Sequence, residues 1–369
     1  MSRKTLIKCS KPHLFPFNNL LNNSLPDRNI AIRCMEPMQI ILFSFSSPKA
    51  ADAVREAGIT VELMDLCLFG LNSIYNCGDQ RIDLKFSETQ KITWGFTGEG
   101  ELDSEDINLH DIATIDGEVI QKSYQKSNEE AGSVTSPNQI VKYLTLIENH
   151  FRSIFQIKNT DIHIFGDEIT TYEDYLDVGN PKKVRMLKIN KELTRDHGNR
   201  ILRAVQAEHL YFHARLPLFS DLSLSFKKIT IESRYTTPQI DYNQWKVLDA
   251  EEIELKVFWH DTDFVAEMIR NWLAKDPEVK WVEKLKMLKI RMDRKVNRDV
   301  LFKDLNTMPY DGNRRAGIWK KVVNGEVELE LELRHAVDIE RSDGKLASIH
   351  VPNDYFIYFV VWHDRFPEY

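Results

Sequence analysis

Long hydrophobic runs and paired cysteines are both missing from this sequence. Its longest uninterrupted apolar run is Tyr355–Trp362, far shorter than the roughly 20 residues that a membrane-spanning helix needs. The four cysteines include no Cys-x-x-Cys pair, which argues against a disulfide-stapled secreted domain and favours a reducing compartment. The basic segment Met1–Lys11 is not followed by the apolar core of a signal peptide. We therefore expect a cytoplasmic or nuclear protein, or one present in both compartments, with no membrane partner.

A strong net charge and the common catalytic motifs are also absent. The net charge of −7 is mildly acidic and gives no reason to expect nucleic acid as a partner. The sequence contains no GxxxxGKS/T phosphate loop, GxGxxG fingerprint, GxSxG elbow or HExxH metal motif. His209 and His213 share one face of a predicted strand but lie some 13 Å apart at roughly 3.3 Å per residue, too far for one metal ion. We expect no catalytic activity, no cofactor and no metal.

What the sequence does have is the composition of an ordinary globular protein. Of its 369 residues, 42% are hydrophobic and 28% are charged, the balance typical of folded soluble domains. This length allows two or three domains with sizeable cores.

Three proline-led segments predict three short helices near the start of the chain. Leu25-Pro26 opens the first, and Pro37 opens the second, in which Ile40, Ile41, Phe43 and Ser44 recur at helical spacing. Ser47-Pro48 caps a third helix that ends at Gly58. So short a module buries too little surface to be robust alone. We expect it either to complete its core against a partner or to cap the domain behind it.

This segment resembles the F-box, the module that docks proteins onto the small adaptor subunit of a cullin–RING ubiquitin ligase. The segment that carries the resemblance is residues 12–57. It is similar to nematode-type F-box proteins in the order of Leu-Pro, Met-Glu-Pro, an apolar pair and Phe-Ser. It implies that an apolar helix face binds the adaptor. The residues so implied are Leu25, Pro26, Ile30, Met35, Pro37, Ile40, Ile41, Phe43 and Ser44.

Residues 58–138 predict a β-rich connecting region. Arg81–Phe86 and Lys91–Phe96 alternate polar and apolar residues on either side of a turn, which indicates a hairpin. Asp116-Gly117 is a tight-turn signal between two further strands. The polar segment Ser127–Asn138 is the best candidate for a linker between domains.

Strand and helix patterns alternate between residues 139 and 300. The apolar stripe of Gln139–Gln156 predicts a helix, and strands are predicted from Ile162, Met186, His209, Ile229, Ile253 and Met287 onward. The first five strands start roughly every 20 to 24 residues, a period typical of leucine-rich-repeat-like stacks with parallel strands. A generic α/β domain with coincidental strand spacing is the alternative.

Residues 301–369 predict antiparallel strands. Val327–Leu333 alternates strictly, and Val337–Glu340, Leu346–Val351 and Tyr355–Trp362 predict a meander with an Asp343-Gly344 turn. The helix expected at Asp263–Lys275, the strand after Leu285 and the tail from Asp338 onward resemble the type-2 F-box-associated domain, whose first segment would cover about residues 240–292. The expected fold is mixed α+β and α/β: a helical F-box, a leucine-rich-repeat-like stack and a C-terminal meander.

Together the two resemblances imply a substrate-recognition subunit of an SCF-type ubiquitin ligase, with the adaptor and cullin subunits and unidentified protein substrates as partners. The alternative is a repeat-type interaction scaffold outside the ligase, in which Ile40, Ile41 and Phe43 face the chain itself. The resemblance implies that substrates bind the C-terminal half. The candidate residues there are Trp259, His260, Arg291, Arg294 and Arg298. A core role for Trp259 and a solvated face for the basic run are the alternatives, and both are the commoner outcomes of such patterns.

Overall fold

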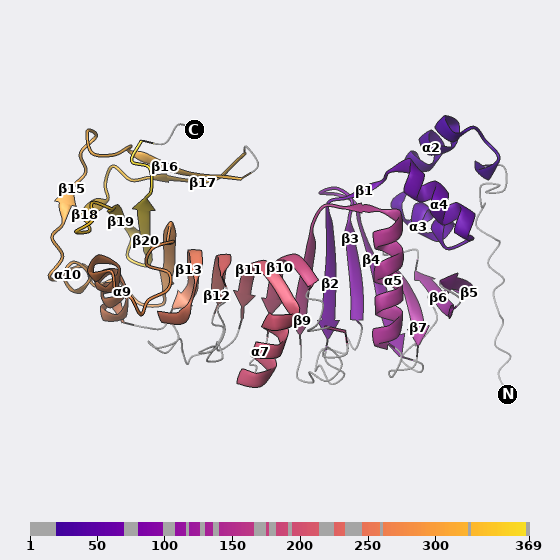
Figure 1. Ribbon diagram of the computed structural model, residues 1–369, viewed down its shortest axis with the longest axis horizontal. Coiled ribbons are helices and arrows are strands. Elements are labelled where there is room, and N and C mark those ends of the chain that lie inside the picture. Colours follow the sequence, from indigo (N-terminus) through magenta and orange to yellow (C-terminus); the bar gives the residue numbers. More distant parts are fainter. Residues whose placement is uncertain are drawn as a thin grey trace. The chain divides into compact units, whose positions relative to one another are not determined.

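Two compact units make up the chain, Met1–Arg185 and Met186–Tyr369. The computed structural model describes residues 20–69, 80–98, 108–115, 118–125, 130–135, 140–165, 175–176, 182–190, 194–213, 225–232, 246–258, 261–323 and 326–366. Both units combine helices with β-strands (Figure 1), which confirms the mixed helix-and-strand fold class. In this described part, no helix is both long and apolar enough to span a membrane.

The three predicted N-terminal helices are confirmed as α2 (Leu25–Arg33), α3 (Pro37–Ser44) and α4 (Pro48–Ala57). Each carries a proline in its first turn, where the missing N–H costs no hydrogen bond. Glu36 and Gln39 form a capping box at the start of α3. At α4, the Ser47 hydroxyl accepts a hydrogen bond from the Ala50 N–H at 3.2 Å, and Gly58 ends the helix with a left-handed φ of 64°.

The sheet of the first unit has the strand order β9-β2-β3-β4-β7-β6-β5. Strands β2, β3 and β4 pair antiparallel, which confirms the hairpin predicted around residues 81–96. Strand β9 joins β2 in parallel, and β5 pairs antiparallel with β6 on either side of residues 116–117. The strands are β2 (Leu63–Phe69), β3 (Gln80–Lys85), β4 (Lys91–Gly98), β5 (Asn108–Ile115), β6 (Glu118–Gln125), β7 (Glu130–Thr135) and β9 (Thr160–Phe165), with β1 (Thr60–Val61) and β8 (Gln156–Ile157) forming a separate parallel pair.

The linker predicted at residues 127–138 is wrong, because this segment contains strand β7. Glu130–Thr135 pairs in parallel with β4 and antiparallel with β6. Backbone pairing on both edges suffices to hold a strand whose sequence, Glu-Ala-Gly-Ser-Val-Thr, has little apolar alternation. The boundary between the compact units falls instead within β10 (Lys182–Ile189). The finer domain limits drawn from the sequence stay predictions.

The two faces of the first unit's sheet differ in chemistry. Leu66, Ile82 and Trp94 are neighbours on β2, β3 and β4 and are fully buried. Helix α5 (Ile140–Ile154), predicted from its apolar stripe, packs on this face (Figure 1), with the Phe151 ring 6.0 Å from that of Trp94. Because strand side chains alternate between faces, the intervening residues Asp65 and Cys67 of β2 belong to the opposite, polar face.

The sheet of the second unit has the order β10-β11-β12-β13-β14-β20-β19-β18-β15. Strands β11 to β14 pair in parallel, as predicted for the strands that start at His209, Ile229, Ile253 and Met287. The predicted meander is confirmed by antiparallel β18, β19 and β20, and β20 also pairs antiparallel with β14. The elements are α7 (Arg195–Ala204), β11 (Val205–Phe212), β12 (Phe226–Glu232), β13 (Ala250–Phe258), α9 (Thr262–Ala274), β14 (Met287–Met292), α10 (Arg298–Leu301), β15 (Met308–Pro309), β18 (Val337–Glu340), β19 (Leu346–Asn353) and β20 (Phe356–Trp362), with β16 (Ile318–Val323) and β17 (Glu326–Glu332) forming a separate hairpin.

Candidate functional site

Helix α2 packs on α4 through its polar side chains. Arg28 forms an ion pair with Glu56. Asn29 donates from Nδ2 to the Glu56 carbonyl at 3.2 Å, and Arg33 donates from Nε to the Ala57 carbonyl at 2.7 Å. The carbonyls at the C-terminal end of α4 carry partial negative charge, so the two arginines also complement the helix dipole.

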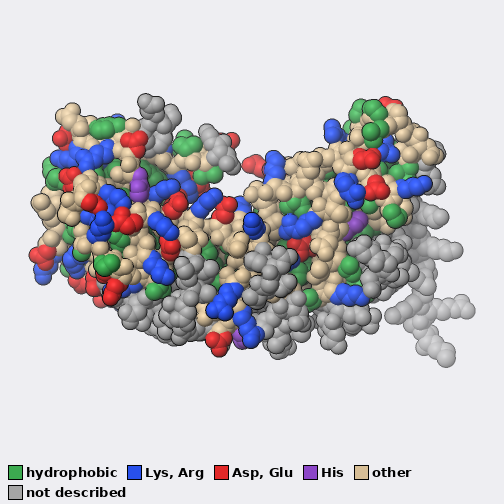
Figure 2. Space-filling view, in the orientation of Figure 1, with side chains coloured by type: hydrophobic (Ala, Val, Ile, Leu, Met, Phe, Trp, Pro, Cys, Tyr) green, Lys and Arg blue, Asp and Glu red, His purple; other side chains and the backbone are tan. Residues whose placement is uncertain are grey.

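Ile32 is the fully buried apolar residue of α2, whereas its other large apolar side chains face outward. Leu25 is 52% exposed and Ile30 is 61% exposed, and Pro26 is exposed between them. Pro26 and Ile30 are four residues apart and therefore share one side of the helix. Figure 2 shows hydrophobic side chains at the surface over α2. Exposed large apolar side chains grouped on a short helix present the chemistry of a docking face.

The remaining residues of the expected adaptor-binding set lie elsewhere. Met35 is partly buried in the connection between α2 and α3. Those on α3 are all buried within the chain: Pro37, Ile40, Ile41, Phe43 and Ser44. The Ser44 hydroxyl lies 2.9 Å from Nε2 of His150 on α5, so α3 is held against α5 within the first unit. The structure thus separates an exposed group on α2 from a buried group on α3.

In the second unit, the predicted basic run does not form one patch. Arg291 lies on β14 with its guanidinium 5.9 Å from the centre of the Phe356 ring. Arg294 is exposed and lies 3.6 Å from the carboxylate of Asp261. The Arg298 guanidinium instead donates to the Val351 carbonyl at 3.0 Å. Trp259 and His260, the other substrate-binding candidates, lie outside the described residues.

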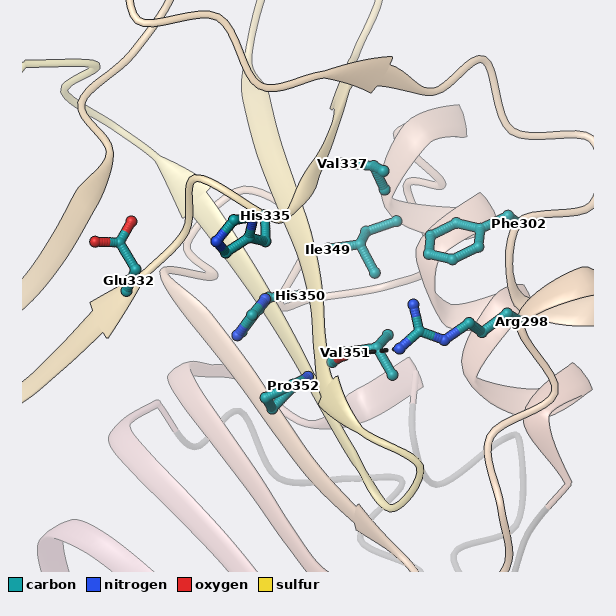
Figure 3. Close-up of a pocket in the computed structure, with 9 residues that line it drawn as sticks. All are labelled: Arg298, Phe302, Glu332, His335, Val337, Ile349, His350, Val351 and Pro352. Carbon is teal, nitrogen blue, oxygen red and sulfur yellow. Dashed lines mark hydrogen bonds between the residues drawn. The ribbon is translucent and has the colours of Figure 1, made fainter.

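Arg298 lines a pocket of about 460 Å³ formed by α10, β18, β19 and the turn after β17. In Figure 3, the rings of His335 and His350 lie beside each other, and Arg298 and Phe302 approach from the other side of β19. Burial lowers the pKa of His350, and the nearby His335 and Arg298 lower it further because they are positive or can become so. The pocket is lined by Arg298, Phe302, Glu332, His335, Val337, Ile349, His350, Val351 and Pro352.

This pocket combines hydrogen-bond donors with an apolar wall. One guanidinium and two imidazoles can donate to a carboxylate or a backbone carbonyl, and the flanking valine, isoleucine and phenylalanine side chains can pack against an apolar group. Sequence reasoning found Arg298 and missed Phe302, His335 and His350. Nothing in the spacing of those residues indicates that separate strands and a short helix bring them together.

The polar face of the first unit's sheet brings together three residues that can bind a metal. Asp65 and Cys67 lie two residues apart on β2, and His163 on β9 lies directly opposite Cys67 in the parallel register. Their donor atoms all lie within 4.8 Å of one another. Burial, followed by the charge of Asp65, raises the pKa of the Cys67 thiol to about 12, which excludes a thiolate nucleophile at neutral pH.

Comparison with known proteins gives little further guidance. No protein-family model matches the chain, and no solved structure matches it. An uncharacterized protein of Caenorhabditis elegans is 23% identical over 246 residues, which cover 65% of this chain and 68% of that protein.

Proposed function

We propose that the chain is a substrate-recognition subunit of an SCF-type cullin–RING ubiquitin ligase and that it binds the adaptor mainly through α2. The exposed Leu25, Pro26 and Ile30 carry this proposal. Exposed apolar side chains on a short helix are stabilised when a partner removes them from water, at about 25 cal/mol per Å² of apolar surface. The buried residues of α3 then serve a supporting role: they hold the module that presents α2.

The second candidate function is a protein-interaction scaffold outside the ligase. Full or nearly full burial of Ile40, Ile41 and Phe43 favours it, because those residues belong to the chain's own core and are not open to a partner. In this function, α2 to α4 cap the first unit, and the exposed side chains of α2 bind no ligase subunit.

Under either function, the second unit is the proposed receptor for other proteins. Its parallel strands β11 to β14, with α7 before β11 and α9 before β14, support a leucine-rich-repeat-like arrangement. The pocket beside Arg298 offers a place for a substrate side chain or chain end. No catalytic step is part of the proposal, and the site of action is the cytoplasm or the nucleus.

A pull-down with surface variants tests the adaptor proposal. Leu25→Asp combined with Ile30→Asp places charge on the proposed face without touching the core, so the adaptor and cullin should no longer co-purify. Val327→Asp is the matched control, because Val327 is 51% exposed on β17 in the other unit. Docking through α2 would be refuted if the wild type, the double variant and the Val327→Asp control all co-purified equal amounts of the adaptor and cullin. If even the wild-type chain brings down neither ligase subunit, the scaffold function holds instead.

A further inference from the structure

We propose that Asp65, Cys67 and His163 form a binding site for a zinc ion on the polar face of the first unit's sheet. The inference is independent of the ligase proposal. The residues come from two neighbouring strands, β2 and β9, whose parallel register places Cys67 and His163 directly opposite each other. The site offers a carboxylate, a thiolate and an imidazole. Among the biological divalent ions, zinc is the one that commonly binds this mixture of oxygen, sulfur and nitrogen donors.

The distances fit a single ion. His163 Nδ1 lies 3.6 Å from Asp65 Oδ2, close to the roughly 3.3 Å that separates two ligands of a tetrahedral zinc ion with bonds of about 2.0 Å. All donor atoms of the group lie within 4.8 Å of one another. A zinc–sulfur bond of about 2.3 Å therefore needs only a small rotation of the side chains.

Arg81, opposite Cys67 on β3, is the nearest cation: it lies 3.4 Å from Asp83 and hydrogen-bonds the Cys67 sulfur, a contact that zinc would displace or share. The Asp65 carboxylate has no such hydrogen-bonded cation beside it among the residues that the structure describes. Its strand neighbours Asp83 and Asp161 already have cationic partners: Lys91 lies 2.8 Å from Asp83, and Arg185 pairs with Asp161. The Oδ1 atom of Asp65 is buried and accepts no hydrogen bond from the described residues. A buried carboxylate oxygen without a donor is costly, and a bound cation would compensate that cost.

The site is also reachable from solvent. The side chains of Asp65 and His163 are 19% and 16% exposed to solvent, whereas Cys67 is buried. Zinc would bind the Cys67 sulfur as thiolate, and the thiol proton would leave to solvent. Three protein ligands leave a fourth position of the ion for water or for a group from a partner.

Metal titration of the purified full-length chain tests the proposal. The chain is first freed of metal with a chelator; Zn²⁺ is then titrated in competition with a chromophoric chelator, and Co²⁺ is used as the spectroscopic probe. We expect one ion per chain and a thiolate-to-cobalt charge-transfer band. Loss of an outer hydrogen-bond partner already costs about 10- to 100-fold in metal affinity, so Cys67→Ser and His163→Gln should each weaken zinc binding by about 100-fold or more.

Matched controls separate this site from other ligands in the chain. Cys34→Ser and His335→Gln change a cysteine and a histidine outside the group, and both should bind zinc like the wild type. Should Cys67→Ser fail to fold, His163→Gln decides the matter, because it alters a side chain that retains contact with water. Absence of the charge-transfer band in the wild type, or wild-type zinc affinity in His163→Gln, would overturn the proposal.

Discussion

Arg315 and Asp338 form an ion pair at 2.8 Å although neither side chain has any exposure to solvent. The guanidinium also donates to the carbonyls of Ala316 and Leu333, each at 2.8 Å. The carboxylate accepts a further hydrogen bond from the Ser348 hydroxyl at 2.7 Å, and Trp362 donates to that hydroxyl at 2.8 Å. The pair thereby ties the segment before β16 to β18, β19 and β20. The other carboxylate oxygen, Asp338 Oδ2, is buried and accepts no hydrogen bond from the described residues, and Arg314 Nη1, 3.7 Å away, supplies a second positive charge beside it.

We predict that Asp338→Ala lowers the free energy of unfolding by about 3–5 kcal/mol, because it leaves the Arg315 charge buried and unpaired. Chemical denaturation, followed by circular dichroism, measures the change. The control is Glu330→Ala, which removes an exposed partner of Lys320 and should cost less than about 1 kcal/mol. Similar losses in the two variants would contradict the role given to the buried pair.

The second prediction concerns acid stability and Glu254 on β13. Burial opposes its ionisation, but Lys228 on β12 and Lys289 on β14, at 2.8 and 3.0 Å, together lower its pKa to about 2. Because the folded-state pKa lies below the ordinary value of 4.5, the stabilisation is present above pH 4.5 and is lost as the pH falls toward 2. At 1.36 kcal/mol per pKa unit, the loss is about 3 kcal/mol.

Glu254→Gln should therefore lower the stability at neutral pH and flatten its decline between about pH 4.5 and 2. Urea denaturation at a series of pH values gives both quantities. The control is Glu251→Gln. Glu251 lies three residues before Glu254 on β13 and is an exposed partner of Lys286, so its substitution should leave the pH profile unchanged. A Glu254→Gln profile that parallels that of the wild type would show that the two lysines do not hold the carboxylate as described.

The third prediction separates the docking face from the core of the N-terminal helices. Phe43→Ala removes a fully buried side chain and should destabilise the first unit by about 3–5 kcal/mol. Leu25→Asp changes an exposed side chain and should alter stability by no more than about 0.5 kcal/mol. Thermal unfolding of both variants tests this division, which fails if Leu25→Asp proves as damaging as Phe43→Ala.

The fourth prediction concerns Gly58, which ends α4 with a φ of 64°. Any residue with a Cβ is strained in this left-handed conformation, so Gly58→Ala should cost about 1–2 kcal/mol. Ala51→Gly, at a partly buried position inside α4, removes helix propensity and should cost about 1 kcal/mol for a different reason. An alanine at position 58 that stabilises the chain would contradict the described backbone.

The sequence was informative wherever the signal is local. The prolines at positions 26, 37 and 48, the Ser47 cap and Gly58 mark the limits of α2, α3 and α4 within a few residues of chain. The side of each helix that remains exposed was not predictable in the same way. For α3, the buried side is decided by α5, which lies nearly a hundred residues further along the chain. There His150 contacts Ser44 and Phe151 packs near Phe45.

Juxtapositions that depend on strand register were beyond the sequence. The contact of Cys67 with His163 requires β9 to return beside β2, and the pairing of Glu254 with two lysines requires three parallel strands in register. Strand β7 was missed because its residues lack apolar alternation, and neighbouring backbones decide its pairing. Local propensity carries no information about such partners.

The position of β20 has a consequence for the order in which the chain is synthesised. This strand lies between β14 and β19, yet its residues leave the ribosome only after all the parallel strands. Until then, β14 has an unpaired edge of backbone N–H and C=O groups next to the apolar residues Leu288 and Ile290. Such an edge readily recruits strands from other chains. Truncated products that end before Phe356 should therefore aggregate or be captured by chaperones, even though most of the second unit has been made.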